Sequence, residues 1–355
     1  MNLPGKQKDI KDFSYEELED YLKSSSEQSF RAAQIFDWLY KKGAEDFDAM
    51  TNLPVALREK LKSDFLTGKP TAVKEEKADD KTVKFLFALA DGEEIETVLI
   101  PTSERVTLCV STQVGCKFHC GFCASGLAGF RRNLSCAEIL AQILYARNHH
   151  PRQSVSHIVF MGIGEPLDNY ENLIKAIRII NSPKAVNIAA RRITISTCGI
   201  VSQIKKLMAE RLQIELAISL HGSNNRLRDL LMPVNKKYPV EELIATCREY
   251  IQKTKRQITF EYILIRGLTC TTESAEELGK LLKKMTCKMN LIPYNKVEEF
   301  GHEPPTKMEI LLFKKRLSEL GIHATVRMPR GRDVNAACGQ LRHVFQAGTQ
   351  RAPAD

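Results

Sequence analysis

The stretch CVSTQVGCKFHCGFCASGLAGFRRN, residues 109–133, holds three cysteines in the spacing CxxxCxxC. Cys116, Cys120 and Cys123 therefore lie within eight residues of one another. A 4Fe–4S cluster normally takes four cysteine thiolates. A set of three leaves one iron open to another ligand, and reductive cleavage of S-adenosylmethionine (SAM) requires such an iron. The spacing thus predicts a 4Fe–4S cluster that binds SAM.

A zinc knuckle is the alternative for the same cysteines. Structural zinc prefers four ligands in paired spacings such as CxxC…CxxC. His119 would have to be the fourth ligand, and it directly precedes Cys120, where the geometry is awkward. No second CxxC pair occurs in the chain, so the sequence favours the cluster.

Composition suggests an intracellular protein with an anionic partner. The 355 residues include no apolar run near the roughly 20 that span a bilayer. The start, MNLPGKQKDIKDF, lacks the apolar core of a signal peptide, so we expect a cytoplasmic protein without membrane contact. Ten cysteines then favour metal and thiol chemistry over a disulfide scaffold. The net charge of +9 suits RNA or DNA, and basic residues cluster at Arg131 and Arg132, Arg191 and Arg192, Lys236 and Lys237, and Arg327, Arg330 and Arg332.

Hydrophobic patterning divides the chain into four parts. Residues 1–71 predict a helical accessory domain, in which Ser14 and Glu17 have the spacing of a capping box. Residues 72–105 alternate around Asp91-Gly92 and predict a β-hairpin extension. Residues 106–345 alternate short apolar strands with helices, which predicts an α/β fold with a parallel sheet, closed or partly closed as a (β/α) barrel. Residues 346–355 form a C-terminal tail.

Polar residues close several of the predicted strands. In β/α barrels the chemistry gathers at the carboxyl ends of the strands, so these residues form a ring suited to a polar cofactor. Glu165 is expected to accept from the amino group of SAM, and serine and asparagine side chains to bind its carboxylate or ribose. The ring consists of Gly164, Glu165, Ser196, Ser219, His221 and Asn295, although each alone would be an ordinary turn residue.

Three further residues are candidates for chemistry. Cys338 lies in the turn AACGQ. A lone cysteine is usually a buried apolar residue, but the arginines at 327, 330 and 332 favour a lowered pKa and a nucleophilic thiol. Cys109 lies on the strand that leads into the cysteine loop. Glu96 would be an exposed strand residue, or a proton acceptor if its strand leads into the site.

The ordered motifs CVSTQVGCxxxCxFCxxGxxGFxRNL, GxGEPLxN, ISTCGI, ISLHG, LMPVN, NLIPYN and RGxDxxAACGQL span nearly the whole chain. The chain thereby resembles the RlmN family, radical SAM methyltransferases acting on adenosine in 23S rRNA and tRNA. The resemblance implies a radical SAM partial (β/α) barrel with an N-terminal helical domain. Two departures are Ile163, where the family usually has methionine, and RGLTCTTES in place of a GVNDS-like turn. By position, the family's cluster ligands are Cys116, Cys120 and Cys123, and its SAM contacts are Gly164, Glu165, Ser196, Ser219, Leu220, His221 and Asn295.

The resemblance also implies a mechanism. Cys338 would carry a methyl group taken from one SAM, and a 5′-deoxyadenosyl radical from a second SAM would activate it for addition to carbon 2. Glu96 would accept the ring proton, and Cys109 would form a transient disulfide with Cys338. The implied partners are 23S rRNA, tRNA and an electron donor such as flavodoxin or ferredoxin, for a monomeric enzyme. Two alternatives stay open: methylation at carbon 8, as in Cfr-type enzymes, and a non-catalytic iron–sulfur RNA-binding sensor.

Overall fold

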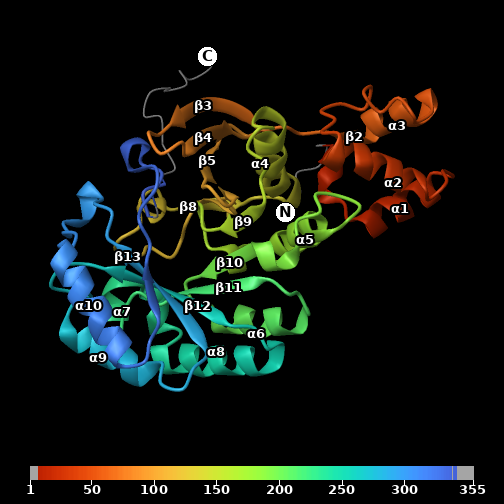
Figure 1. Cartoon of the computed structure of the whole chain (residues 1–355). Coiled ribbons are helices and arrows are strands. Elements are labelled where there is room, and N and C mark those ends of the chain that lie inside the picture. Colours follow the sequence, from red (N-terminus) through yellow and green to blue (C-terminus); the bar gives the residue numbers. More distant parts are fainter. Residues whose placement is uncertain (1–6, 338, 342–355) are drawn as a thin grey trace, which may run out of the picture.

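A ten-stranded, mostly parallel sheet organises the chain, for which a computed structural model describes residues 7–337 and 339–341 (Figure 1). The strand order is β14-β13-β12-β11-β10-β9-β6-β5-β4-β3. The run from β6 to β14 is parallel, and β3, β4 and β5 extend it antiparallel. The strands are β3 Thr71–Lys77, β4 Val83–Ala88, β5 Glu94–Pro101, β6 Val106–Cys109, β9 His157–Phe160, β10 Ile193–Thr197, β11 Glu215–Ser219, β12 Ile258–Leu264, β13 Cys287–Pro293 and β14 Ala324–Val326.

Helices connect the consecutive parallel strands, as parallel pairing requires. Ser135 and Thr306 begin two of these helices with capping boxes, in which the side chain of Glu138 or Glu309 returns to the cap backbone. This alternation confirms the α/β fold predicted from the sequence. The connecting helices are α4 Cys136–His149, α5 Tyr170–Asn181, α6 Val201–Ala209, α7 Asn225–Leu231, α8 Val240–Thr254, α9 Thr272–Leu281 and α10 Lys307–Glu319.

The N-terminal segment is helical and lies to one side of the sheet (Figure 1). It contains α1 Tyr15–Ser24, α2 Arg31–Phe36 and α3 Val55–Asp64. The predicted capping box is present, since the Glu17 amide donates to Ser14 Oγ at 3.1 Å and Glu17 Oε2 accepts from the Ser14 amide at 2.6 Å. Helix α2 continues at Asp37–Lys41 as a π-helix, because the Lys42 amide donates to the Asp37 carbonyl five residues back.

The predicted hairpin is β4 and β5, which pair antiparallel around the Asp91-Gly92 turn. The sequence did not predict β3, which adds a third antiparallel strand at the sheet edge. Its residues TAVKEEK are mostly exposed and charged, so they lack the apolar alternation that reveals a strand. The hairpin continues the main sheet and does not stand apart from it.

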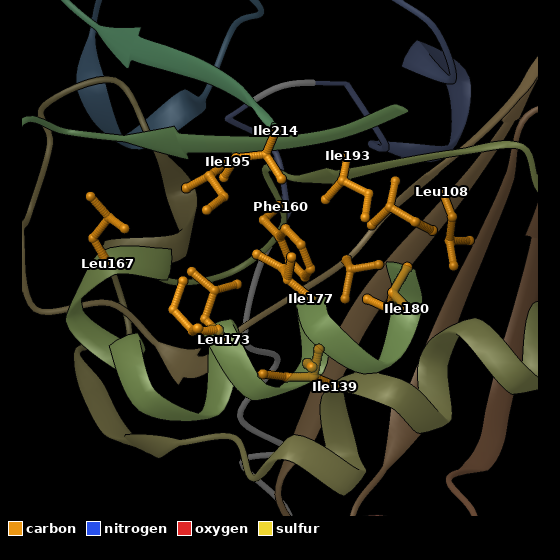
Figure 2. Packing of buried hydrophobic residues seen from close by; sticks show 14 of the residues in the cluster. Leu108, Ile139, Phe160, Leu167, Leu173, Ile177, Ile180, Ile193, Ile195 and Ile214 are labelled. Atoms are coloured by element: carbon orange, nitrogen blue, oxygen red, sulfur yellow. The ribbon is translucent and has the colours of Figure 1, made fainter. Parts of the chain in front are cut away.

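The main core lies between the sheet and its helices. Figure 2 shows Leu173, Ile177 and Ile180 of α5 facing Phe160 of β9 and Ile193 of β10. These five side chains are fully buried, and each stabilises the fold by about 1.5–3 kcal/mol through loss of apolar contact with water. This packing fixes the helices on one face, so the strand ends keep a constant spacing around the site. Over the described residues, no helix is both long and apolar enough to cross a membrane.

Candidate active site

The three cysteines of the CxxxCxxC set lie in a loop closed by a short β-ribbon. Strand β7, Gln113–Gly115, pairs with β8, Phe130–Asn133. The Cys116 amide donates to the Gly129 carbonyl at 3.1 Å where the loop begins. Gly115 has a φ of +70°, and a Cβ there would lie 1.8 Å from the Gly129 oxygen. A larger residue at this position would therefore prevent the loop from closing.

The cysteine loop forms one wall of a pocket at the carboxyl ends of the parallel strands. The pocket encloses about 930 Å³, part of it open to solvent. Cys116, Cys120 and Cys123 all line it. Burial raises the pKa of the Cys116 thiol to about 12 and also raises the pKa of the other two. A bound cation would hold these thiols as thiolates at neutral pH.

A 4Fe–4S cluster and a zinc knuckle differ in how their ligands are arranged. Among residues 7–337 and 339–341, no three Cys, His, Asp or Glu side chains converge closely enough to hold one metal ion. In a 4Fe–4S cluster each cysteine binds its own iron, so the sulfurs need not converge. A zinc knuckle would bring its ligands to one point.

The GxGEP loop faces the cysteines across the pocket, and Gly164 and Glu165 line it. Gly164 has a φ of +103°, and a Cβ there would lie 2.5 Å from Cβ of Gln113. Glu165 Oε1 accepts from the Leu167 amide at 3.0 Å, and its Oε2 accepts from the Cys198 amide at 2.7 Å. The carboxylate thus joins the ends of β9 and β10 and keeps further lone pairs for a ligand.

The other predicted ring residues fall into two groups. Ser196, Ser219 and His221 line the pocket. Burial lowers the pKa of His221 to about 3, and its Nδ1 accepts from the Ile263 amide at 3.1 Å. His221 therefore orients the loop as a neutral ring. Leu220 and Asn295 are buried and do not belong to the described pocket lining.

Arg228 of α7 is a buried residue that sequence reasoning missed. Its Nη1 donates to the Ser219 carbonyl at 3.0 Å and to the Leu220 carbonyl, and its Nη2 donates to the Cys198 carbonyl at 3.2 Å. Asn235, within the LMPVN motif, accepts from Nε at 2.9 Å. Arg228 thereby fixes the carboxyl ends of β10 and β11. Within HGSNNRLRDLL it looked like one exposed basic residue among several.

Glu96 and Cys109 lie on the inner face of β5 and β6. Glu96 is buried, and its Oε1 lies 3.1 Å from Nζ of Lys84. The prediction that Glu96 is a solvent-exposed strand residue is therefore wrong. Val98, two residues along the same strand, is the register partner of Cys109. The two side chains pack in one apolar cluster with Ile163, so the residue that departs from the family pattern contacts this region.

Residues on both sides of position 338 pack near Cys109 and the cysteine loop. Ala336 and Leu341 join the cluster around Cys109. The Ala124 amide donates to the Gly339 carbonyl at 2.8 Å, and Ser125 Oγ donates to the Leu341 carbonyl at 2.9 Å. Gly339 also lines the pocket. The chain on both sides of residue 338 is thus held between the cysteine loop and β6.

Cys338 lies outside the described residues, and so do its predicted roles as methyl carrier and as transient disulfide partner of Cys109. Two of the three arginines expected to lower the pKa of its thiol have other partners. Arg327 Nη1 lies 3.6 Å from Glu261 Oε1, and Arg330 Nη1 lies 3.7 Å from Asp80 Oδ2. These carboxylates offset two of the positive charges on which the sequence argument relied.

Arg132 is also less available than its sequence context indicated. Its guanidinium contacts Asp91 at 2.6 Å and forms two hydrogen bonds to Glu138 at 2.7 and 2.8 Å. These carboxylates raise the pKa of Arg132 above its ordinary value. The side chain joins the β4–β5 turn to α4, so it stabilises the fold beside the cysteine loop.

Comparison with known proteins agrees with this geometry. Residues 8–66 match the ribosomal RNA large subunit methyltransferase N-terminal domain, and residues 110–282 match the radical SAM superfamily. The chain is 47% identical to a probable dual-specificity RNA methyltransferase RlmN from Clostridium novyi, covering 95% of this chain and 98% of the relative. A relative of the same name from Staphylococcus saprophyticus is 45% identical, with 96% and 94% covered. The crystal structure of a radical SAM methyltransferase from Sphaerobacter thermophilus is similar at a TM-score of 0.91 and 44% identity, covering 95% of this chain and all of that one.

Proposed function

This chain belongs to the RlmN family of radical SAM RNA methyltransferases, and we propose that it methylates carbon 2 of adenosine in 23S rRNA and in tRNA. One observation carries the proposal. The three cysteines of the CxxxCxxC set and Gly339, the neighbour of Cys338, line the same pocket. The predicted cluster site and the residue next to the predicted methyl carrier therefore border one substrate space.

The chemistry explains why such a pocket is needed. Carbon 2 of adenine lies between two ring nitrogens and is not nucleophilic, so it cannot attack a sulfonium methyl directly. When bound by its three cysteines, the 4Fe–4S cluster supplies the electron that cleaves SAM reductively. Cys338 carries the methyl group as a thioether, and Glu96, held by Lys84, accepts the proton that leaves carbon 2.

Release of the product requires a second thiol. The Cys109 thiolate attacks the sulfur of Cys338, and the bond from that sulfur to the methylene carbon breaks as the disulfide forms. The electron pair stays on the methylene carbon, which takes up a proton and becomes the methyl group of the product. Cellular thiols then reduce the disulfide. The packing of Cys109 with Ala336 and Leu341 supports this pairing. Replacement of Cys109 by alanine should stall the protein as a covalent adduct with RNA, visible as a band of reduced mobility. Free turnover by this variant would contradict the assigned release step.

The remaining partners follow from the same chemistry. The target base must leave its stack to enter the pocket, which favours loops and single-stranded RNA. Each turnover consumes two molecules of SAM and requires a low-potential donor such as flavodoxin or ferredoxin. We assign the enzyme to the cytoplasm, as a monomer. Its ribosomal target lies in the peptidyl-transferase centre, and its tRNA target in the anticodon loop.

The direct test is nucleoside mass spectrometry of RNA treated with the reconstituted protein, SAM and a reductant. We expect 2-methyladenosine from 23S rRNA fragments and from tRNA. The Cys338→Ala variant should retain its iron and yield none. Formation of 8-methyladenosine would establish the Cfr-type alternative, and absence of both methylated adenosine and 5′-deoxyadenosine would favour the RNA-binding sensor.

A further inference from the structure

A second wall of the pocket carries a polar row, defined as Ser219, Glu261 and Asn290. These residues are register partners on β11, β12 and β13, and partners in register direct their side chains to the same face of a sheet. Ser219 and Glu261 line the pocket. The row is therefore a continuous set of hydrogen-bonding groups, two of which border the pocket.

Glu261 is the unusual member of the row. It is only 4% exposed. Its Oε1 accepts from Asn290 Nδ2 at 2.8 Å and lies 3.6 Å from the Arg327 guanidinium. In the described part of the chain, its Oε2 is buried and has no hydrogen-bond partner. A buried acceptor without a partner costs the folded protein free energy, so a ligand that donates to it would bind favourably.

Burial and two neighbouring residues act in opposite directions on the pKa of Glu261. Burial raises the pKa of Glu261, while Arg327 and the hydrogen bond from Asn290 oppose that rise. The two neighbours hold one oxygen, and the other has no hydrogen-bond partner among the described residues. The carboxylate is thus oriented but incompletely satisfied, as expected for a group completed by a bound molecule.

Position within the sheet indicates which part of a ligand would meet Glu261. Glu165, on the cysteine-loop side, follows β9, and Glu261 lies on β12, three strand spacings away, or about 14 Å along the sheet. If the amino-acid end of SAM lies near Glu165 and the open iron, its nucleoside end must extend along the strand ends toward β11 and β12. A ribose offers two neighbouring hydroxyl donors, and carboxylates recognise ribose hydroxyls in other nucleotide sites.

We propose that Glu261 binds the ribose diol of SAM through its Oε2 atom, with Asn290 and Arg327 holding the carboxylate in position. This inference rests on the proposed function, because it requires SAM in the pocket. It adds a specificity-determining residue that distinguishes ribonucleoside from deoxyribonucleoside forms of the cofactor. The signal in the sequence is a single acid within the apolar strand ITFEYIL.

The test is calorimetric binding of SAM to the cluster-containing protein. Hydrogen bonds to charged groups correspond to about 10- to 100-fold in affinity. Glu261→Ala should weaken SAM binding by that amount, and Glu261→Gln by less, because an amide still offers a neutral partner. Glu273→Gln, which removes one exposed acid on α9, should bind SAM as the wild type does. Iron content and thermal unfolding confirm that each variant is folded.

SAM analogues that lack the 2′- or the 3′-hydroxyl identify the contacted group. The wild type should bind at least one of them about 10-fold or more weakly than SAM, and Glu261→Ala should bind SAM and that analogue almost equally. An undiminished preference for the hydroxyl in Glu261→Ala would overturn the inference. So would unchanged SAM affinity with weakened RNA affinity, because the target ribose would then be the partner. Failure of the wild type to bind SAM would instead refute the proposed function.

Discussion

The two walls of the pocket are built in opposite ways. The cysteine loop takes its three ligands from eight consecutive residues, and a two-stranded ribbon closes it. The polar row takes one residue from each of three strands, so its members are about 30–40 residues apart in the chain. A ligand set within one loop is readable as a motif, whereas a set assembled by strand register becomes visible only in the folded sheet.

Loss of a cysteine from the loop should have the largest effect on cluster binding and on SAM cleavage. Cys120→Ala removes one of only three thiolates, so we expect loss of the brown cluster absorbance and of SAM cleavage. Cys136→Ala is the control, because Cys136 is a buried cysteine that lies in α4 and does not line the pocket. A Cys120→Ala protein that kept a full cluster and its activity would refute the ligand assignment.

Substitution of Arg228 tests whether the wall that carries the polar row depends on a side chain from helix α7. Arg228→Met removes a buried guanidinium that serves carbonyls of β10 and β11. We expect a loss of about 3–5 kcal/mol in the free energy of unfolding, measured in urea, together with weaker SAM binding. Arg226→Met on the exposed face of the same helix should change neither. Equal stability of the two variants would show that the strand ends hold their positions without Arg228.

These cases show what the sequence could and could not predict. It predicted the cluster loop, the α/β alternation and Ser196, Ser219 and His221 at the pocket, because each depends on local pattern. It missed Glu261 and Arg228, because their roles arise from register and burial. The domain boundaries stay predictions, as do the roles assigned to Cys338, Cys109 and Glu96, to the three cluster cysteines and to the predicted SAM contacts.

The pH dependence of the free energy of unfolding tests the lowered pKa of His221. The folded pKa of about 3 lies below the ordinary value of about 6.5, so below pH 6.5 the unfolded chain binds a proton that the folded chain does not. Stability therefore falls with pH from about 6.5 to 3, by about 1.4 kcal/mol per pH unit. Between pH 7 and pH 5, His221→Gln should lose about 2 kcal/mol less than the wild type in denaturant unfolding. Parallel losses in the two proteins would mean that His221 titrates normally.

The smallest expected effect concerns RNA binding beside the cysteine loop. Arg132 is engaged by Asp91 and Glu138, so Arg132→Ala should lower the melting temperature and leave the salt dependence of RNA affinity unchanged. Arg131→Ala, at an exposed position, should reduce that salt slope by about one counterion. A reduced slope for Arg132→Ala, with unchanged melting temperature, would return Arg132 to the RNA-binding surface.

The most direct test of the central claim follows one atom of the substrate. The substrate is a 23S rRNA fragment with deuterium at carbon 2 of the target adenosine. It is treated with the cluster-containing protein, SAM and a reductant. The mass of the methylated nucleoside is then measured by mass spectrometry. Methylation at carbon 2 predicts that the product has lost the deuterium. A methylated adenosine that retains the deuterium would place the methyl group elsewhere on the base and contradict the account.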